Sequence, residues 1–263
     1  MELLPIHLIQ ISQSKLNTID HIVHSIYRLI IYSKHHSDDD LLDSYLKGAH
    51  NLKELLSLKN AQMESQSEFE AREYLANFKE GLAFAIDEII DQVNFDSVVQ
   101  LFQLLRLTSP EANALHPNNF RTTLVQIGGH LCPEPKEVPM LVNNLFYQMQ
   151  NIQNPIIRAI YFHHELIRIH PFVDGNGRVT RLAKNWMLMY NLYPPTYITE
   201  TNTKKVYIDA LANSFSALEK SPRAWNEHTQ LFFEQELDNL IYNATELYKS
   251  IDKIGKKREK LAE

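Results

Sequence analysis

The stretch HPFVDGNGRVTR, residues 170–181, lies between two segments in which apolar residues recur with the 3.6-residue period of a helix. The flanking segments read RAIYFHHELIRI before the stretch and RLAKNWMLMYNL from its last residue onward. Asp-Gly and Asn-Gly pairs are common turns of β-hairpins, but neither flank alternates with the period of a strand. We therefore predict a helix over 155–169, a loop over 170–176 and a second helix from about 177 to 191.

The rest of the chain follows the same helical pattern. Its 263 residues include seven glycines, and glycine is among the residues least favourable inside a helix. No internal repeat and no flexible linker divides the sequence. We predict an all-α protein folded as one compact unit, with further helices over 17–32, 41–63, 68–91, 94–107, 137–150, 203–219 and 224–256.

The segment 109–139 is the expected exception. It contains five prolines and the Gly128–Gly129 pair, which together interrupt a helix. Within it, Thr123, Val125 and Ile127 alternate with their neighbours as the residues of a strand do. We predict a short strand or β-hairpin in this segment.

Composition places the chain among ordinary soluble proteins. Hydrophobic residues make up 44% and charged residues 22%, and the formal net charge of −6 does not favour nucleic acid as a partner. The single cysteine, Cys132, gives no disulfide framework. The first residues lack the basic region and cleavage site of a signal peptide, and no apolar run approaches the ~18 residues of a membrane span. We expect a cytoplasmic protein with no membrane partner.

The predicted loop combines the residue types that phosphoryl chemistry requires. Glycines before a helix let backbone N–H groups approach an anion, and the helix N-terminus attracts negative charge. Arg178 and Arg181 are three residues apart, so they share a helix face there and suit phosphate oxygens. Asp174 offers an oxygen ligand to Mg²⁺, and His170 can accept a hydroxyl proton. These parts predict transfer of a phosphorus-containing group.

The stretch also matches the signature HxFx(D/E)GNGRxxR at every fixed position, and through it the chain resembles the Fic family. FRTTLVQIGG (120–129), followed by PEPKEVP (133–139), is similar to the family's substrate-docking flap. WNEHTQLFFEQEL (225–237) is similar to its helical C-terminal extension. The resemblance implies a Fic helical core over 96–218 with a small β-hairpin flap, an N-terminal helical region over 1–95 and a C-terminal helical extension over 219–263.

The resemblance implies a protein adenylyltransferase, which moves AMP from ATP to a Tyr, Thr or Ser hydroxyl of a target protein or of itself. His170 would be the general base, Asp174 would hold Mg²⁺ or Mn²⁺ on the phosphates, and Phe172 would anchor the loop in the core. A target segment would add a strand to the flap. The phosphate-binding residues would be Gly175, Asn176, Gly177, Arg178 and Arg181, with Arg181 on the γ-phosphate, and the flap residues would be Val125, Gln126 and Ile127.

Many family members block themselves with a helix carrying (S/T)xxxE(G/N), whose glutamate pairs with the second arginine of the signature. This chain has no strict match. The nearest segment is NAQMES (60–65), at the end of a predicted inhibitory helix near 50–64, and it makes Glu64 the residue that would reach Arg181. A weaker rival is Ala76–Gly81, in the middle of a predicted helix. The bland alternative is that Glu64 is an ordinary surface residue.

Other interpretations stay open at this point. The same residues would serve removal of AMP, and a non-catalytic module that only senses nucleotide is the alternative of a different class. A homodimer is compatible with the sequence. His163 and His164 invite a metal site, but they lack the spacing and partner ligands of one. We therefore expect them to be packed in the core or satisfied at the surface.

Overall fold

Helices α8 (Pro155–Ile169) and α9 (Asn176–Tyr190) form the centre of the computed structural model, which describes residues 1–33, 68–197 and 201–262. They are the two helices predicted on either side of the signature loop, and both are buried over most of their length. Asn154 caps α8, because its side-chain oxygen accepts hydrogen bonds of 3.0 Å from the backbone N–H groups of Ile156 and Ile157. Pro155 follows at the first helical position, where no N–H is needed.

Three helices pack around this central pair. α4 (Glu68–Ile90) and α5 (Val98–Thr108) lie against α9, while α7 (Val138–Met149) lies against α8. Phe95 joins these layers, since its ring centroid lies 5.4 to 5.8 Å from the rings of three neighbours on α7, α8 and α9. Such large buried rings contribute heavily to core stability. These neighbours are Phe146, Phe162 and Trp186.

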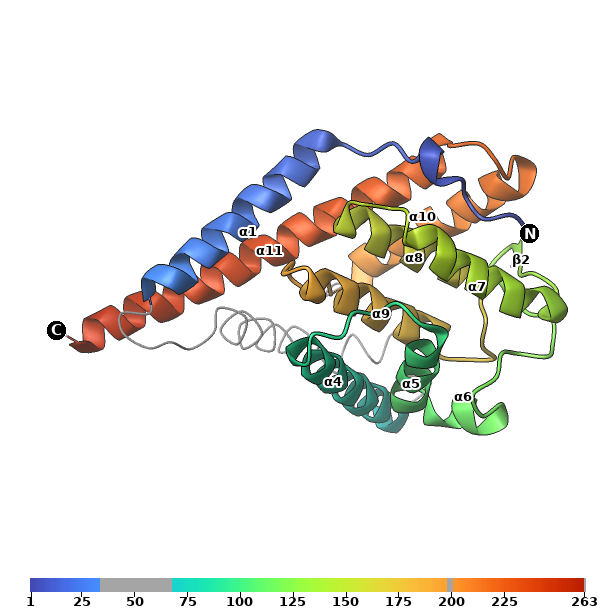
Figure 1. Cartoon of the computed structure of the whole chain (residues 1–263), viewed down its shortest axis with the longest axis horizontal. Coiled ribbons are helices and arrows are strands. Elements are labelled where there is room, and N and C mark those ends of the chain that lie inside the picture. Colours follow the sequence, from blue (N-terminus) through green and yellow to red (C-terminus); the bar gives the residue numbers. More distant parts are fainter. Residues whose placement is uncertain (34–67, 198–200, 263) are drawn as a thin grey trace.

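The helices at the two ends of the chain run side by side. α1 (Gln13–Ser33) and α11 (Glu227–Ala262) form a long pair that extends from the bundle (Figure 1), and α10 (Thr201–Lys220) packs against α11. The apolar face predicted for 17–32 is buried at Ile19, Val23 and Ile26. Among the helices of the described residues, none combines the length and apolarity needed to cross a membrane.

The predicted hairpin is present and short. β1 (Gln126–Ile127) pairs antiparallel with β2 (His130–Leu131) in a two-stranded sheet. The connecting Gly128 has a φ of +56° and Gly129 has no positive φ, which is the pattern of a type II′ turn. The all-α fold with one small hairpin is thus confirmed. The register places Gln126 opposite Leu131 and Ile127 opposite His130.

Some elements differ from the sequence-based expectation. The segment 109–139, predicted to be non-helical, contains the short helix α6 (Pro110–Leu115), which proline starts and which buries Ala112. The described part of the chain also contains the 3₁₀ turns η1 (Ile6–Leu8) and η3 (Pro135–Glu137). The helix predicted over 41–63, with the inhibitory segment near 50–64, lies outside the described residues.

The start of α5 also differs from the prediction, which placed it at residue 94. Ser97 and Gln100 form a capping box in which each side chain bonds to the backbone of the other. This reciprocal cap fixes the first helical residue at Val98. Periodicity alone does not locate such a boundary, because the apolar pattern begins before the cap.

Candidate active site

His170 ends α8 in the left-handed backbone region, with φ 53° and ψ 62°. Its N–H still bonds to the carbonyl oxygen of Leu166 at 2.9 Å. Histidine is one of the residue types, besides glycine, that occur in this region more often than most. The left-handed conformation of His170 therefore ends α8 and begins the signature loop. The side chain of His170 is half-buried.

The environment of His170 favours a neutral imidazole. Burial is the main reason that its pKa falls from 6.5 to about 4, since the charged ring would lose hydration. Arg121 and His130 lower this pKa further, whereas the backbone of Ile167 and the carboxylate of Asp174 oppose the shift. Nδ1 is buried and has no hydrogen-bond partner within the described part of the chain. At neutral pH the ring therefore carries a lone pair that can take up a proton.

Two interactions fix the loop between the helices. Phe172 is buried and packs beside the rings of Phe102 and Phe120, with centroids 5.9 and 6.0 Å away, which confirms the predicted anchor. The side-chain amide of Asn176 accepts a hydrogen bond from the N–H of Phe172 and donates one to its carbonyl oxygen, both at 2.9 Å. Both polar atoms of the Asn176 side chain therefore bond to the loop backbone. Its backbone N–H is the group that an anion could contact.

Gly175 makes the turn into α9. Its φ of +80° suits glycine, and a Cβ at this position would lie 2.1 Å from Oγ and 2.6 Å from Cβ of Ser109. The first hydrogen bond of the helix runs from the N–H of Val179 to the carbonyl oxygen of Gly175 at 3.0 Å. The N–H groups of residues 176–178 therefore have no partner within the helix. Such N–H groups can bind an anion, and phosphate binding by them stays a prediction.

Arg181 folds back over the beginning of its own helix. A Cβ built on Gly177 would lie 3.1 Å from Nη1 of Arg181, so the guanidinium passes close beside that glycine. Its charge is thereby added to the partial positive charge of the helix N-terminus. A guanidinium next to unpaired backbone N–H groups is well suited to phosphate oxygens.

Arg178 points elsewhere, although the sequence predicts that it contacts phosphate. Its guanidinium is buried and donates to the carbonyl oxygen of Thr108 at 3.0 Å and to Oδ2 of Asp174 at 2.8 Å. Its Cζ also lies 3.9 Å from the ring centre of Tyr74, a cation–π contact. Arg178 therefore joins the loop to α4 and α5. The two arginines of the signature diverge because the C-terminal carbonyl of α5 binds one of them.

Asp174 is the acidic side chain of the loop, and 68% of it is exposed. Within the described residues, no group of three or more His, Cys, Asp or Glu side chains is placed to hold a metal. A cation at Asp174 would therefore need phosphate oxygens and water for its other ligands. Mg²⁺ is commonly bound in this way, so the donor set fits that ion.

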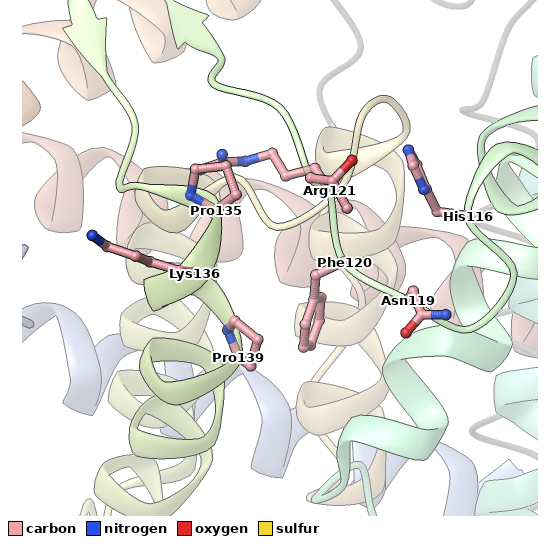
Figure 2. Close-up of a pocket in the computed structure, with 8 residues that line it drawn as sticks. His116, Asn119, Phe120, Arg121, Pro135, Lys136 and Pro139 are labelled. Carbon is pink, nitrogen blue, oxygen red and sulfur yellow. The ribbon is translucent and has the colours of Figure 1, made fainter.

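The base of the flap adjoins a cavity of about 400 Å³ (Figure 2). Arg121 forms part of its wall and extends toward Pro135. Arg121 was not predicted as a site residue, because its one signal in the sequence is a charge between Phe120 and the alternating residues of the flap. Tyr74 gave no signal, because its contact depends on how α4 packs. The lining residues are His116, Asn119, Phe120, Arg121, Thr122, Pro135, Lys136 and Pro139.

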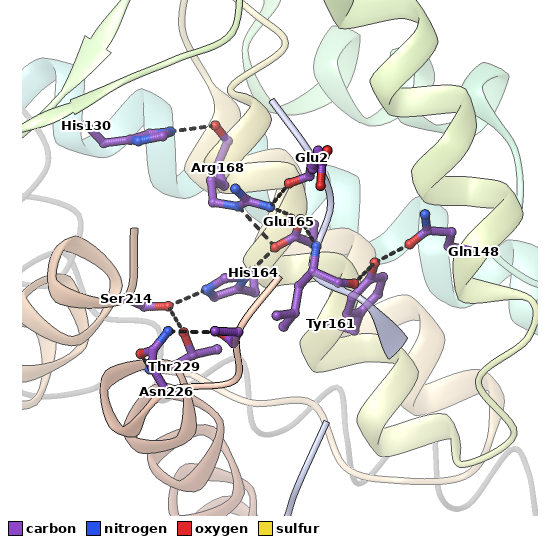
Figure 3. Close-up of polar contacts among 12 residues, drawn as sticks. Glu2, His130, Gln148, Tyr161, His164, Glu165, Arg168, Ser214, Asn226 and Thr229 are labelled. Atoms are coloured by element: carbon purple, nitrogen blue, oxygen red, sulfur yellow. Dashed lines mark hydrogen bonds and ion pairs between the residues drawn. The ribbon is translucent and has the colours of Figure 1, made fainter. Parts of the chain in front are cut away.

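His163 and His164 are both buried in the core, which was one of the two alternatives expected for them. Figure 3 shows the polar contacts of His164. Nδ1 of His164 lies 2.7 Å from Oε1 of Glu165, and its Nε2 lies 2.8 Å from Oγ of Ser214. Burial lowers the pKa of both histidines, to about 4 for His163. Glu165 also pairs with Arg168, so the polar groups of this network satisfy one another.

Glu64, the predicted inhibitory residue, lies outside the described residues. Its rival segment Ala76–Gly81 lies within α4. Gly81 faces α9, where a Cβ would be 2.6 Å from the side chain of Leu182, whereas Glu80 is exposed to solvent. The glutamate of the rival segment therefore lies on the solvent side of α4.

Known proteins share both the sequence and the fold of this region. Residues 92–188 match the Fic/DOC family. "Protein adenylyltransferase Fic" of Culex quinquefasciatus is 31% identical over 123 residues, which is 45% of this chain and 25% of that relative. The chain therefore spans about a quarter of the length of the curated relatives it matches.

Two solved structures extend the comparison to the whole fold. A Fic domain-containing signaling protein from Bacteroides thetaiotaomicron has a TM-score of 0.69 at 18% identity, covering 89% of this chain and 98% of that one. IbpAFic2 in complex with adenylylated Cdc42 has a TM-score of 0.54 at 14% identity, covering 89% of this chain and 71% of that one. Residues 92–188 therefore match the Fic/DOC family, and they lie in a helical fold similar to that of solved Fic proteins.

Proposed function

We propose that this chain transfers AMP from ATP to a Tyr, Thr or Ser hydroxyl of a protein, either a separate target or the chain itself. Curated relatives at about 30% identity are named protein adenylyltransferases, and IbpAFic2 was solved with adenylylated Cdc42. One observation carries the proposal. A neutral histidine at the end of α8 is followed, across a short fixed loop, by the open N-terminus of α9.

In the proposed reaction the target hydroxyl oxygen attacks the α-phosphorus of ATP. A new O–P bond forms as the bond to the pyrophosphate leaving group breaks, and His170 takes up the hydroxyl proton. The low pKa of His170 ensures that the ring is neutral before the reaction. The ring later releases the proton to water. Proton transfer of this kind contributes about 10²–10⁴-fold to a rate.

The phosphate chain would bind at the start of α9. The N–H groups of residues 176–178 and the guanidinium of Arg181 converge beside Gly177 and would offset the negative charge of the phosphates. Arg178 would support the phosphate site without contacting phosphate, because its hydrogen bonds to Thr108 and Asp174 hold the loop in place. A direct phosphate contact by Arg178 would require it to leave one of these partners.

Asp174 would hold Mg²⁺ or Mn²⁺ against the phosphates. Its carboxylate is largely exposed, and its Oδ2 accepts a hydrogen bond from Arg178, which fixes its direction. The cation would supply positive charge that offsets the charge of the phosphate chain. Removing the carboxylate with Asp174→Asn should therefore weaken nucleotide binding in Mg²⁺ more than in EDTA.

The target would pair with the outer edge of β1. In a hairpin closed by a two-residue turn, the two residues that flank the turn form hydrogen bonds with each other. The next residue along each strand directs its backbone N–H and C=O away from the partner strand. The hydrogen bond of 3.1 Å from the N–H of Cys132 to the carbonyl oxygen of Val125 fits this alternation. Gln126 is then the residue with outward backbone groups. Leu124 and Leu131, on the same face as its side chain, are 57% and 64% exposed, and they offer apolar contacts to a target.

The experiment is self-labelling of the chain with ATP that carries ³²P at the α-phosphate, read on gels and by intact mass. Label at the α-position should transfer in Mg²⁺ or Mn²⁺, and label at the γ-position should not. His170→Ala should slow transfer by about 100-fold or more, whereas His24→Ala, an exposed histidine on α1, should leave it unchanged. The proposal fails if no variant gains AMP or releases it from a modified protein.

We extend the proposal to a restraint by Glu64 on Arg181, on the strength of the NAQMES resemblance. A carboxylate on Arg181 would occupy the place of the γ-phosphate. Glu64→Gln should therefore label itself faster than the wild type, and Glu80→Gln, the matched change in the rival segment, should not. The reverse result would assign the restraint to α4.

A further inference from the structure

One buried arginine connects the flap to the loop that carries the general base. Arg121 exposes 2% of its surface. Its Nη1 donates to the carbonyl oxygen of Thr123 at 2.8 Å, and its Nη2 donates to that of Pro133 at 2.6 Å. Its Nε donates to the carbonyl oxygen of His170 at 2.7 Å, with a longer contact of 3.4 Å from Nη2 to Ile169. A single guanidinium thus bonds to both limbs of the flap and to the end of α8.

The backbone of the same residue adds a further tie. The N–H of Arg121 donates to the carbonyl oxygen of Pro171 at 2.9 Å. Carbonyl groups at the end of a helix have no partner within it and favour a positive charge. Arginine presents five N–H donors in one rigid plane, so it can serve several such acceptors at once. Lysine, with a single nitrogen, cannot span the same set of directions.

The tip of the flap has a separate anchor. His130 on β2 places Nε2 at 3.1 Å from the carbonyl oxygen of Arg168, and its Nδ1 contacts the carboxylate of Glu219 on α10. This anchor fixes β2 against α8 and α10, but it does not reach the loop after residue 169. The ring of Phe120 packs against that of Phe172, and among the described hydrogen bonds it is those of Arg121 that join the base of the flap to the signature loop.

We propose that Arg121 is a positioning residue, which sets the flap relative to His170 so that a target strand on β1 presents its hydroxyl to the imidazole. This inference rests on the proposed AMP transfer. Placement within about 1 Å matters for such a step, because an error of that size costs on the order of 100-fold in rate. The phosphate site at the start of α9 does not contact Arg121, so nucleotide binding should not depend on it.

The test compares Arg121→Met, which keeps the length without the donors, with Arg121→Lys, which keeps the charge. Arg106→Met, at an exposed arginine of α5, is the control. The rate constant of self-labelling should fall on the order of 100-fold in Arg121→Met. Its affinity for α,β-methylene-ATP, measured by calorimetry, should be unchanged. Backbone hydrogen exchange should accelerate at residues 121–132 and at His170, while α7 and α9 stay protected. Arg121→Lys should lie between.

Two results would overturn the inference. One is unchanged backbone hydrogen exchange at residues 121–132 in Arg121→Met. The other is a variant in which nucleotide affinity, protection of α9 against hydrogen exchange and the rate of AMP transfer all fall together. That result would make Arg121 an ordinary core residue. Where Arg121→Met does not fold, Arg121→Lys is judged by the same criteria. If the wild type transfers no AMP, the proposed function fails, while the exchange data still decide whether Arg121 couples flap and loop.

Discussion

Replacement of Gly175 by alanine tests the geometry of the signature loop. Alanine in the left-handed region costs about 1–2 kcal/mol, and the backbone here has a φ of +80°. The added Cβ would lie 2.1 Å from Oγ of Ser109, and overpacking in a core costs about 1–3 kcal/mol. We therefore expect Gly175→Ala to lower the free energy of unfolding by about 2–5 kcal/mol. Gly129→Ala is the control, since its Cβ would meet nothing within 4 Å.

A Ser109→Gly background separates the two contributions. Without the Ser109 side chain the two shortest contacts disappear and Cδ1 of Leu105, at 3.3 Å, is the nearest remaining atom, so Gly175→Ala should then cost about 1–2 kcal/mol, mainly from its backbone. The difference, about 1–3 kcal/mol, is the coupling energy of a double-mutant cycle. Urea unfolding followed by circular dichroism measures all four proteins. The reasoning is refuted if Gly175→Ala is as stable as Gly129→Ala, or if the cycle shows no coupling.

Three further predictions concern the loop, the base and the flap. Asn176→Ala leaves the N–H and carbonyl of Phe172 unpaired and should lower the free energy of unfolding in urea by about 2–4 kcal/mol. An unchanged unfolding midpoint would show that these two hydrogen bonds do not stabilise the loop. His170 must be neutral to accept a proton, so kcat/KM for ATP should persist down to about pH 4 rather than fall near 6.5. Asp174 and bound phosphates favour the charged ring, whereas Arg121 and His130 disfavour it. The pKa of His170 should therefore be higher with nucleotide bound, and kcat should begin to fall at a higher pH than kcat/KM. If both pH profiles fell together near pH 6.5, the result would contradict this prediction. Gln126→Pro removes the outward N–H of β1 and should weaken labelling of a protein target in gel assays, with α,β-methylene-ATP binding unchanged in calorimetry.

Local signals made much of the fold predictable. The period of apolar residues located α8 and α9, and Asn154 with Pro155 marked the start of α8. The glycines of the signature predicted a turn into a helix, and Gly175 makes that turn. The pair at Gly128 and Gly129 marked the hairpin in the same way. In each case the physical cause lies within a few residues of its effect.

The contacts that position the site were not predictable, because they join residues far apart in the sequence. Arg178 is next in sequence to the predicted phosphate-binding residues, yet its partner Thr108 is 70 positions away. Arg121 reaches His170 across 49 positions. A signature gives the residue types at a site, but the direction of each side chain depends on which backbone groups other helices leave unpaired. For Arg178 and Arg121 those groups are carbonyls at the ends of α5 and α8.

The electrostatics of the site follow from opposite ends of two helices. The C-terminus of α8 carries partial negative charge, which by itself would stabilise a charged imidazole at His170. Burial is the main cause of the low pKa of His170, and the positive charge of Arg121, which donates to the carbonyl oxygen of His170, lowers this pKa further. In the proposed reaction the N-terminus of α9 and Arg181 would attract a phosphate chain, whose negative charge would raise the pKa of His170. A base that is neutral but weak in the absence of nucleotide would thus become stronger when the phosphates bind, which ties proton transfer to the presence of the donor.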